Sequence, residues 1–576
     1  PPWPTGWSIG SADDGATTAP GRAGRRPARP RPVGSASFPG APRRPTTLSA
    51  VNDPVARTAD VPAETPWDSA RYLREILRAP VYEAAEHTPL QPMRTLSARL
   101  GCAVAVKRED LQTVHSFKIR GAYNAMRALG EAERARGVIT ASAGNHAQGV
   151  ARSATLLGVD ATIVMPTVTP RIKVDAVRDL GGRVLLLGDN FDAAKAEAQR
   201  IAQTEGRTFI APFDDPRVIA GQGTIGLEIV QQDAELDRLF VPVGGGGLAA
   251  GIAVLVKALM PQVRVIGVEH EESACLSAAL AAGGPVTLER VGLFAEGVAV
   301  RRVGRETFRL CSALLDDVVT VSSDQVSAAV RDIFEDVRAV PEPSGALALA
   351  GLKIYAAEHG IVGERLACVL SGANLNFHQL RYICERSELG EQREAILGVT
   401  IPEVQGEFLR FASVLGGRSV TEFNYRLAAA GPSGAPARIF VGVRLTRGRQ
   451  ERAEIVADLE AAGYGVIDLT DDELAKVHVR SMVGGRAPAG LTERLFSFEF
   501  PESPGALMRF LEILGTRWNI TLFHYRTDGA DYGRILTAFE VGGDPADSTL
   551  TEHMDRLGYA YREETDDPSA RFFLAD

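Results

Sequence analysis

From Trp67 to about residue 390, short apolar runs rich in Val, Ile and Leu alternate with longer stretches of helical periodicity. Each run is apolar throughout, which is typical of strands that are buried on both faces. Parallel strands joined by helices have this property, because the helices cover both faces of the sheet. The alternation therefore predicts an open, mostly parallel, doubly wound α/β domain over residues 67–390. The predicted strands lie at residues 103–106, 138–141, 161–164, 184–187, 239–243, 265–268 and 366–370.

Residues 1–66 differ in composition from this domain. They hold 13 of the 33 prolines, and residues 1–50 contain seven Arg but no Lys. Such a segment buries too little apolar surface to offset the entropy of ordering, so we expect it to be disordered. The segment resembles an organelle transit peptide. Alternatively, it is a tail without a targeting role, or the start of the sequence has been placed too far upstream. It lacks the apolar core of a signal peptide, so we expect a cytoplasmic protein, or an organellar one if the segment is a transit peptide.

The charge and cysteine content exclude several classes of protein. Lys and Arg total 63 against 72 Asp and Glu, which gives a net charge of −9 without a long basic block. This balance argues against nucleic acid or an anionic membrane as a partner. No run approaches the roughly 20 apolar residues of a membrane-spanning helix. The five cysteines are scattered without CxxC spacing, so we predict no disulfide framework and no metal site, and a reducing compartment.

An internal repeat follows a polar hinge at residues 386–393. Residues 402–408 resemble residues 501–507 at an offset of 99, and Phe423 and Tyr425 recur as the same residue types at an offset of 100. Each copy has the order strand, helix, strand, strand, helix, strand, which is typical of ferredoxin-like folds.

The repeat predicts two small α+β sandwiches side by side, at residues 397–470 and 493–565. The last strand of the second copy is expected at residues 559–561. Such a pair can bind small ligands between its copies, or it can serve only to assemble subunits.

The segment 116–122, Ser-Phe-Lys-Ile-Arg-Gly-Ala, follows a predicted strand and opens a helix. Lys118 lies between Phe117 and Ile119 on an otherwise apolar side, although a lone Lys in a helix is usually a surface residue. Burial disfavours the charged ammonium, so the pKa of such a lysine falls or its amine is bonded covalently. A lysine of lowered pKa is what a Schiff base requires, so Lys118 is the candidate catalytic residue.

Two further segments place small residues between a strand and a helix. In residues 142–149, Ser-Ala-Gly-Asn-His-Ala-Gln-Gly, the N–H groups at the helix start can bind a carboxylate. Asn145 can also hydrogen-bond a ring oxygen, whereas His146 alone indicates little. The four glycines at 244–247 let backbone amides wrap a phosphate at a helix N-terminus.

Two of these signals stay ambiguous at this point. Gly244, Gly246 and Ala249 also fit the dinucleotide pattern GxGxxG/A, and Glu269 follows about 20 residues later, so a nicotinamide-dependent enzyme is an alternative. Ser371 begins the segment Ser-Gly-Ala-Asn after an apolar run. Its hydroxyl lies where ligands bind in open α/β sheets, or it caps the following helix.

Together the four segments resemble the fold-type II pyridoxal-phosphate (PLP) enzymes, and among them the biosynthetic threonine dehydratases (threonine ammonia-lyases). The motifs Ser-Phe-Lys-x-Arg-Gly-Ala, Ser-Ala-Gly-Asn-His-Ala-Gln-Gly, Gly-Gly-Gly-Gly-Leu and Ser-Gly-Ala-Asn occur in that order, and residues 294–300 also look like this family. The resemblance covers residues 67–390, and the repeat looks like the ACT-like regulatory domain of the feedback-regulated form. It implies a PLP-dependent catalytic domain followed by two ferredoxin-like, ACT-like subdomains.

The resemblance implies a role for each matching residue. Lys118 would hold PLP covalently, and its freed amine would remove the α-proton of the substrate. Ser371 would donate one neutral hydrogen bond to the pyridine nitrogen, which leaves the ring a moderate electron sink suited to β-elimination. The implied PLP-binding residues are Lys118, Asn145, Gly244, Gly245, Gly246, Gly247, Leu248 and Ser371. The implied substrate-carboxylate residues are Ser142, Ala143, Gly144, Asn145 and His146.

The implied reaction converts L-threonine into 2-oxobutanoate and ammonia, a committing step toward isoleucine. L-Serine would also react, because one methyl group is worth only about 1–3 kcal/mol. Isoleucine would inhibit and valine would oppose it near Phe408, Tyr425 and Tyr525, although these rings could equally pack the sandwiches. The family also implies a homotetramer. A catabolic dehydratase or a serine racemase shares the catalytic motifs, and a non-catalytic amino-acid sensor is a further alternative.

Overall fold

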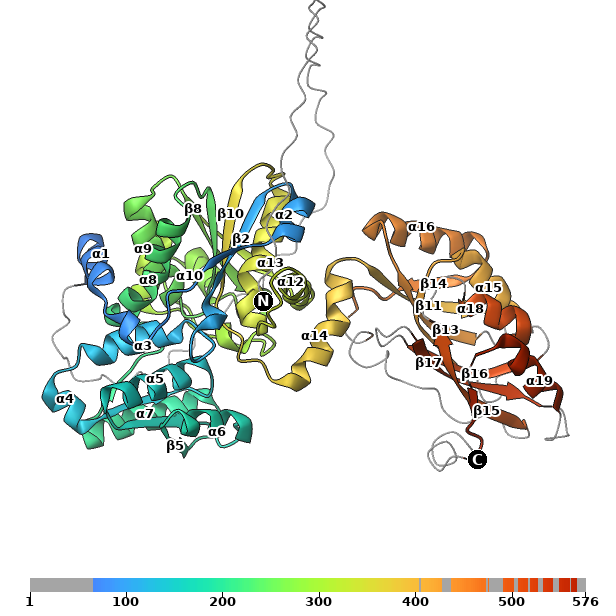
Figure 1. Ribbon diagram of the computed structural model, residues 1–576, viewed down its shortest axis with the longest axis horizontal. Coiled ribbons are helices and arrows are strands. Elements are labelled where there is room, and N and C mark those ends of the chain that lie inside the picture. The colour runs from blue at the N-terminus through green and yellow to red at the C-terminus, as the bar shows by residue number, and fades with distance from the viewer. Residues whose placement is uncertain are drawn as a thin grey trace, which may run out of the picture. The chain divides into compact units, whose positions relative to one another are not determined.

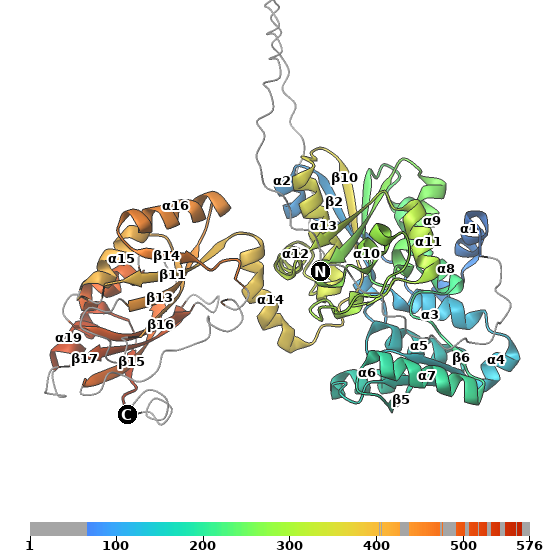
Figure 2. The same cartoon turned by 180° about the vertical axis from the view of Figure 1, so that it is seen from behind.

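The computed structural model describes most of the chain beyond Thr65 and is shown from two opposite sides in Figures 1 and 2. The predicted disorder of residues 1–66 falls outside the described residues, apart from Pro66. The described residues are 66–402, 404, 406–426, 437–472, 475, 491–501, 506–515, 518–526, 532–541, 548–559 and 561–566.

Residues 66–390 contain two largely parallel sheets, which confirms the predicted α/β class. A six-stranded sheet has the order β1-β2-β10-β7-β8-β9, in which β1 pairs antiparallel with β2 and the other pairs are parallel. A four-stranded sheet has the order β5-β4-β3-β6 with parallel pairs throughout. The strands are β1 (Leu90–Pro92), β2 (Ala103–Arg108), β3 (Val138–Ala141), β4 (Ala161–Met165), β5 (Arg183–Leu186), β6 (Thr208–Phe209), β7 (Arg238–Pro242), β8 (Arg264–His270), β9 (Asp317–Val321) and β10 (Arg365–Leu370).

Helices cover both faces of these sheets (Figure 1). The six-stranded sheet lies between a layer containing α8 and α9 and a layer containing α12 and α13. The helices are α1 (Ser69–Arg78), α2 (Arg94–Leu100), α3 (Lys118–Arg127), α4 (Glu131–Arg136), α5 (Asn145–Leu157), α6 (Arg171–Asp179), α7 (Phe191–Glu205), α8 (Pro216–Gln232), α9 (Gly247–Leu259), α10 (Cys275–Ala282), α11 (Arg305–Leu314), α12 (Ser323–Val337), α13 (Pro343–Glu358) and α14 (Phe377–Gly390).

Successive residues of the central strands pack against opposite helix layers. In β7, Leu239 and Val241 join the cluster of α8 and α9, whereas Phe240 joins the cluster of α12 and α13. In β10, Ala367 packs in the cluster of α8 and α9, and Cys368 packs in the cluster of α12 and α13. Burial of a side chain of this size stabilises the fold by about 1.5–3 kcal/mol. Both faces are therefore apolar, which explains the continuous apolar runs in the sequence.

Glycines bring three of the helices into close contact. A Cβ on Gly221 of α8 would lie 2.7 Å from the Cα of Gly121 in α3. A Cβ on Gly251 of α9 would lie 2.7 Å from the backbone nitrogen of Gly223 in α8. Real Cβ atoms do not approach other atoms this closely, so α3, α8 and α9 pack backbone to backbone.

The C-terminal part forms one antiparallel sheet of eight strands, in the order β14-β11-β13-β12-β16-β17-β15-β18. The predicted order of elements is confirmed in both copies, but the copies share a sheet and are not two separate sandwiches. The first copy comprises β11 (Glu394–Ile401), α15 (Glu407–Leu415), β12 (Val420–Arg426), β13 (Ala437–Arg444), α16 (Gly448–Ala461) and β14 (Gly465–Asp468). The second comprises β15 (Glu493–Pro501), α18 (Ala506–Phe510), β16 (Ile520–Arg526), β17 (Tyr532–Glu540), α19 (Ser548–Leu557) and β18 (Tyr561–Glu563).

The two copies join at equivalent strands. In the antiparallel β12–β16 pair, Asn424 lies opposite His524, and Phe423 and Tyr425 lie opposite Tyr525 and Phe523. Because equivalent residues of the two copies pair with one another, an approximate two-fold axis passes through the Asn424–His524 position. The helices of both copies pack on one face of the sheet (Figure 2).

One local prediction in the second copy was wrong. The strand expected at residues 559–561 begins at Tyr561, because the turn after α19 extends through Gly558 at a φ of +75°. The helix after β15 ends as a π-helical turn over Leu511–Gly515.

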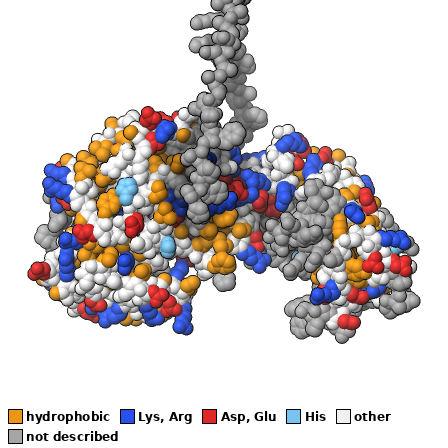
Figure 3. Space-filling view, viewed as in Figure 1, with side chains coloured by type: hydrophobic (Ala, Val, Ile, Leu, Met, Phe, Trp, Pro, Cys, Tyr) orange, Lys and Arg blue, Asp and Glu red, His pale blue; other side chains and the backbone are white. Residues whose placement is uncertain are grey.

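Charged and apolar side chains are intermixed over the described face that Figure 3 shows. Among the described residues, no helix combines the length and apolar composition needed to cross a membrane. The same residues contain no group of three or more His, Cys, Asp or Glu side chains placed to hold a metal ion.

Candidate active site

Three of the four predicted segments begin where a parallel strand ends. Ser142 follows β3, Gly244 follows β7 and Ser371 follows β10. Ligands of open α/β sheets bind at the carboxyl ends of the strands, so this placement agrees with the predicted ligand site. The fourth segment reaches it by backbone pairing, since the N–H of Phe117 donates to the carbonyl oxygen of Ser371 over 3.1 Å.

Lys118 is the first residue of α3, as predicted. Its Nζ donates to the carbonyl oxygen of Pro212 over 2.9 Å. Burial lowers the pKa of Lys118 to about 8, and the charge of Glu342 opposes this shift in part. The amine is therefore half neutral near pH 8, whereas an ordinary lysine has a pKa of about 10.4. A neutral amine is the form that attacks a carbonyl carbon or accepts a proton.

Residues 212 and 213 connect this lysine with the glycine loop. Pro212, which accepts from Lys118, precedes Phe213, and a Cβ on Gly245 would lie only 2.2 Å from the Phe213 ring. Gly246 has a φ of +89°, a left-handed conformation that favours glycine. Both positions therefore need glycine, one because of its neighbour and the other because of its backbone.

Side chains beneath the loop bind its carbonyl groups. Thr307 Oγ1 donates to the carbonyl oxygen of Gly245 over 2.7 Å, and the thiols of Cys275 and Cys311 donate to the flanking glycines. Among the described residues, none accepts a hydrogen bond from the N–H groups of residues 244–248. The loop thus presents its N–H groups at the start of α9, which is the arrangement that binds a phosphate.

Residues Ser142, Ala143, Gly144, Asn145 and His146 form a single turn at the start of α5, in which Gly144 is the N-cap. The N–H groups of the first turn are free to bind an anion. The His146 ring does not face this turn as a ligand, because its Nε2 donates to the carbonyl oxygen of Ile210 over 3.0 Å. Burial, together with the charge of Lys118, lowers the pKa of His146 to about 3, so the ring is neutral.

The side chain of Asn145 belongs to a chain of hydrogen bonds. Its Nδ2 donates to Glu342 over 2.6 Å, and its Oδ1 accepts from Asn374 over 2.6 Å. Ser344 Oγ donates to the same Glu342 oxygen over 2.8 Å, and Ser371 Oγ donates to the carbonyl oxygen of Ser344 over 3.2 Å. The chain therefore connects Asn145 with Ser371, the residues expected to contact the ring oxygen and the pyridine nitrogen of PLP.

Glu342 is the site residue that sequence reasoning missed. Its carboxyl group is buried, and burial raises its pKa. It is 197 residues from Asn145 in sequence, so no local motif connects the two. The available signal was its position between Pro341 and Pro343, where a proline fixes the first residue of a helix and leaves the glutamate at the cap.

Two alternatives from the sequence do not fit this geometry. Ser371 does not cap a following helix, because the next helix begins at Phe377. Glu269, which the nicotinamide hypothesis needs for a ribose, accepts from the N–H groups of Leu276 and Ser277 at the start of α10. The carboxylate of Glu269 therefore binds the start of α10 and does not face a ligand site.

Comparison with known proteins identifies the family. Residues 81–372 match the family model of the pyridoxal-phosphate dependent enzymes, and residues 385–479 and 485–574 match the C-terminal regulatory domain of threonine dehydratase. The chain is 65% identical over 508 residues to L-threonine dehydratase biosynthetic IlvA of Escherichia coli, which covers 88% of this chain and 98% of the relative. The chain belongs to the biosynthetic threonine dehydratases.

Solved structures share the fold of this dehydratase family. The processed form of threonine deaminase isoform 2 from Solanum lycopersicum has a TM-score of 0.55 at 45% identity, over 58% of this chain and 99% of that chain. Maize serine racemase has a TM-score of 0.51 at 31% identity, over 54% of this chain and 95% of that chain. Because a racemase shares the fold, the fold alone does not select the reaction.

The cofactor of the family is PLP, and the residues present here fit it. The glycine loop leaves N–H groups for the phosphate, and the amine of Lys118 donates to Pro212, next to the Phe213 ring that lies against that loop. Ser116 Oγ is buried and has no hydrogen-bond partner among the described residues. Ser116 pairs by an isolated bridge with Gly372, next to Ser371. A buried hydroxyl without a partner is costly, so a bound ligand that supplies one fits this position.

The predicted effector residues lie in an aromatic cluster of the C-terminal sheet. The Phe408 ring contacts Tyr425 at 4.5 Å between centroids, and Phe423 contacts Phe523 at 5.4 Å. Tyr425 and Tyr525 are both buried. Packing accounts for these contacts, and effector binding at them stays a prediction.

Proposed function

We propose that this chain converts L-threonine into 2-oxobutanoate and ammonia with PLP bound at Lys118. Membership of the biosynthetic threonine dehydratases supports the substrate and the reaction. The observation that carries the site assignment is the amine of Lys118, with its pKa lowered to about 8, which donates to Pro212, the neighbour of the Phe213 ring that lies against the glycine loop.

When bound, PLP supplies an electron sink for the negative charge that develops at the α-carbon of the substrate. The N–H groups at the start of α5 bind the substrate carboxylate, aided by the positive end of the helix dipole. Residues 244–248 bind the phosphate of the cofactor. Lys118 Nζ, once the amino group of the substrate has replaced it on the cofactor, would take the α-proton as general base.

Two side chains orient the cofactor in this proposal. Asn145 is held at both ends, by Glu342 and Asn374, so its amide group keeps one orientation toward the ring oxygen. Without cofactor the Ser371 hydroxyl donates to the carbonyl oxygen of Ser344, and in this proposal it rotates to donate its one proton to the pyridine nitrogen when PLP binds. A neutral donor stabilises a ring charge less than a carboxylate would, which favours elimination over reactions that need a long-lived carbanion.

Regulation belongs to the same proposal. Isoleucine inhibits the reaction, and valine opposes this inhibition. Both bind to the two copies of the repeat at residues 397–470 and 493–565, with contacts near Phe408, Tyr425 and Tyr525. A homotetramer in the cytoplasm is also proposed. Sedimentation velocity tests the assembly, because four chains of 61.5 kDa each must sediment together.

The test of the catalytic proposal is a ketoacid assay with L-threonine and with L-serine, with and without isoleucine. Lys118→Ala should lower turnover by about 10²–10⁴-fold, the usual contribution of a general base, or more. The exposed Lys195→Ala is the matched control and should leave turnover unchanged. Formation of D-serine in place of a ketoacid would instead support a racemase. Near-normal turnover of Lys118→Ala would refute the site assignment.

A further inference from the structure

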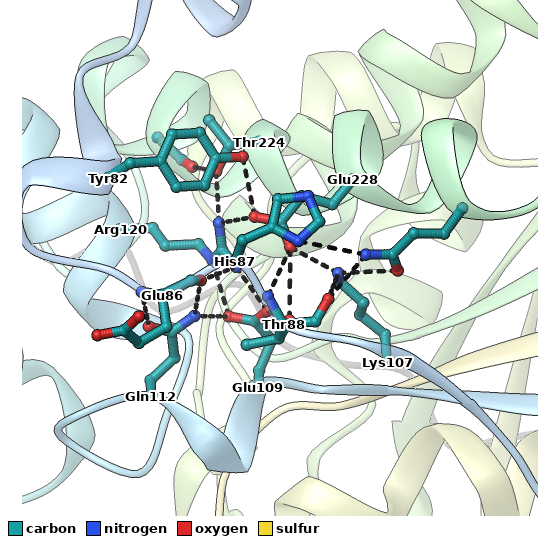
Figure 4. A network of polar contacts seen from close by, with 12 residues as sticks. Tyr82, Glu86, His87, Thr88, Lys107, Glu109, Gln112, Arg120, Thr224 and Glu228 are labelled. Carbon is teal, nitrogen blue, oxygen red and sulfur yellow. Dashed lines mark hydrogen bonds and ion pairs between the residues drawn. The ribbon is translucent and has the colours of Figure 1, made fainter.

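Arg120 lies two residues beyond Lys118 in the same motif, and its guanidinium group is completely buried. Its Nε and Nη2 donate to the two carboxylate oxygens of Glu109, each over 2.8 Å. Its Nη1 donates to Glu228 over 2.6 Å and to Thr224 over 3.2 Å, and Nη2 also donates to the carbonyl oxygen of Glu86 (Figure 4). All five N–H groups of the guanidinium therefore have an acceptor.

The network around Arg120 is balanced in charge. Glu228, on α8, also accepts from Lys107 Nζ over 2.5 Å, and Lys107 is completely buried on β2. The four charged groups, Lys107, Arg120, Glu109 and Glu228, thus comprise two cations and two carboxylates. Burial alone would raise the pKa of Glu228, but Arg120 and Lys107 hold it below the ordinary value, so the carboxylate stays charged.

Stability alone does not explain such a network. Replacing a buried ion pair by apolar residues of similar volume is often neutral or stabilising, whereas removing one partner is strongly destabilising. What the network adds is geometry, because a planar guanidinium bound by a fork to one carboxylate fixes both its position and its orientation. Arg120 and Glu109 flank Lys118 in sequence, and Glu228 lies on a different helix.

Helix α8 is the element that this geometry connects to the active site. Four and three residues before its first residue lie Pro212, whose carbonyl oxygen accepts from Lys118, and Phe213, whose ring lies against the glycine loop. Thr224 Oγ1, which accepts from Arg120, donates in turn to the carbonyl oxygen of Gly221, where α8 touches α3. The position of α3 on α8 therefore sets the position of the lysine amine relative to the loop.

We propose that Arg120, Glu109, Glu228 and Lys107 form a positioning network that holds α3 on α8, so that Lys118 and the phosphate-binding glycines keep a fixed separation. Arg120 is its central positioning residue and touches neither substrate nor cofactor. The proposal rests on PLP binding at Lys118. A network that only stabilised the fold would leave cofactor binding unchanged at temperatures where the protein is folded. A positioning network predicts that PLP binding changes at those temperatures.

The test compares Arg120→Lys with the wild-type full chain at 25 °C. The variant keeps the charge and loses the fork. We expect the dissociation constant for PLP, measured by absorbance titration of the apoenzyme, to rise at least tenfold and kcat to fall at least tenfold. KM for threonine should change less than threefold, and the pH midpoint of the visible band of bound PLP should shift. A folded variant with a lower melting temperature but unchanged PLP binding and kcat would overturn the proposal.

Lys353→Met is the matched control. Lys353 forms a partly buried ion pair with Asp332 on α12 at 2.5 Å, outside the α3–α8 contact. It should lower the melting temperature and leave PLP binding and kcat within twofold of wild type. A tenfold loss of PLP binding in this control would show that general destabilisation weakens the cofactor site, and it would overturn the positioning role.

Thr224→Val decides the matter if Arg120→Lys does not fold. It removes one acceptor of Arg120 and leaves all four charges in place, so we expect two- to fivefold weaker PLP binding. Unchanged PLP binding in this variant would overturn the proposal. Wild-type protein that takes up no PLP would instead contradict the proposed function, so the two failures are distinguishable.

Discussion

The two sheet regions of this chain place their polar side chains differently. In residues 66–390, three of the four polar segments follow a parallel strand, and none of the segments of Lys118, Asn145 and Ser371 is repeated in the sequence. In residues 394–566, one antiparallel sheet carries the same residues twice, with Phe423 and Tyr425 repeated as Phe523 and Tyr525. In the proposed function, the first arrangement makes each of these three groups irreplaceable. The second arrangement forms a symmetric pair of positions. Such a pair suits the binding of a regulatory ligand better than it suits catalysis.

The comparison predicts that a glycine substitution weakens PLP binding in the first region and leaves it unchanged in the second. Gly245→Ala places a Cβ 2.2 Å from the Phe213 ring, so the loop must move and PLP binding should weaken at least 100-fold. Gly465→Ala, in the antiparallel sheet, meets Thr400 at an ordinary 3.5 Å and is the matched control. Absorbance titration with PLP measures both. Equal PLP affinity of the two variants would contradict the assigned role of the loop.

The catalytic region should also show a pH dependence that originates at Lys118. Its pKa is lowered to about 8, and a lysine amine loses its proton as the pH rises. The neutral, reactive form therefore increases from pH 7 to pH 9, and the rate at which the apoenzyme takes up PLP should rise with a midpoint about 2 pH units below that of an ordinary lysine. Stopped-flow absorbance measures this rate. A midpoint near pH 10 would show that burial does not lower this pKa.

The support beneath the glycine loop should have a moderate effect. Thr307→Val removes the hydroxyl that donates to the carbonyl oxygen of Gly245 over 2.7 Å. A hydrogen bond of this kind contributes about 1 kcal/mol, which corresponds to about fivefold weaker PLP binding. Thr155→Val removes a similar hydroxyl, which donates to the carbonyl oxygen of Leu180, and should leave PLP binding unchanged. If both variants bind PLP as wild type does, Thr307 does not support the loop.

The smallest effect is expected in the repeated region. Tyr425→Phe and Tyr525→Phe each remove one hydroxyl from the aromatic cluster. The isoleucine concentration for half-inhibition should rise severalfold, since a coupling of about 1–3 kcal/mol is typical, while kcat without isoleucine stays within twofold of wild type. Initial rates over an isoleucine series measure both quantities. A loss of kcat with unchanged inhibition would place these tyrosines in the structural core alone.

Local sequence signals found seven of the ten strands in residues 66–390 and the four candidate ligand-binding segments, but they missed the short strands β1 and β6 and the strand β9. These signals act over a few residues, since a run of apolar residues or a glycine turn depends mainly on its neighbours. Thr307 could not be found in this way, and the prolines beside Glu342 indicate only a helix cap, because the partners that give these two residues a role are 62 and 197 residues away. Arg120 was visible within its motif, but its function depends on Glu228, 108 residues later on another helix.

The shared sheet of the two repeats was missed for a similar reason. The offset of 100 residues shows that the copies are alike. It does not show which edge strand of each copy pairs with the other copy, and in the structure these strands are β12 and β16. Edge strands carry unpaired backbone groups, so two such units can join at them. Nothing in either copy alone specifies which edge is used.

The most direct test of the account is borohydride reduction of the purified protein with PLP, followed by peptide mass spectrometry. Reduction fixes the cofactor to the lysine amine that holds it. We expect the pyridoxyl group on one peptide, the one that contains Lys118, together with irreversible loss of the visible absorbance. A pyridoxyl group on another lysine, or unmodified Lys118 after full loading, would contradict the central claim.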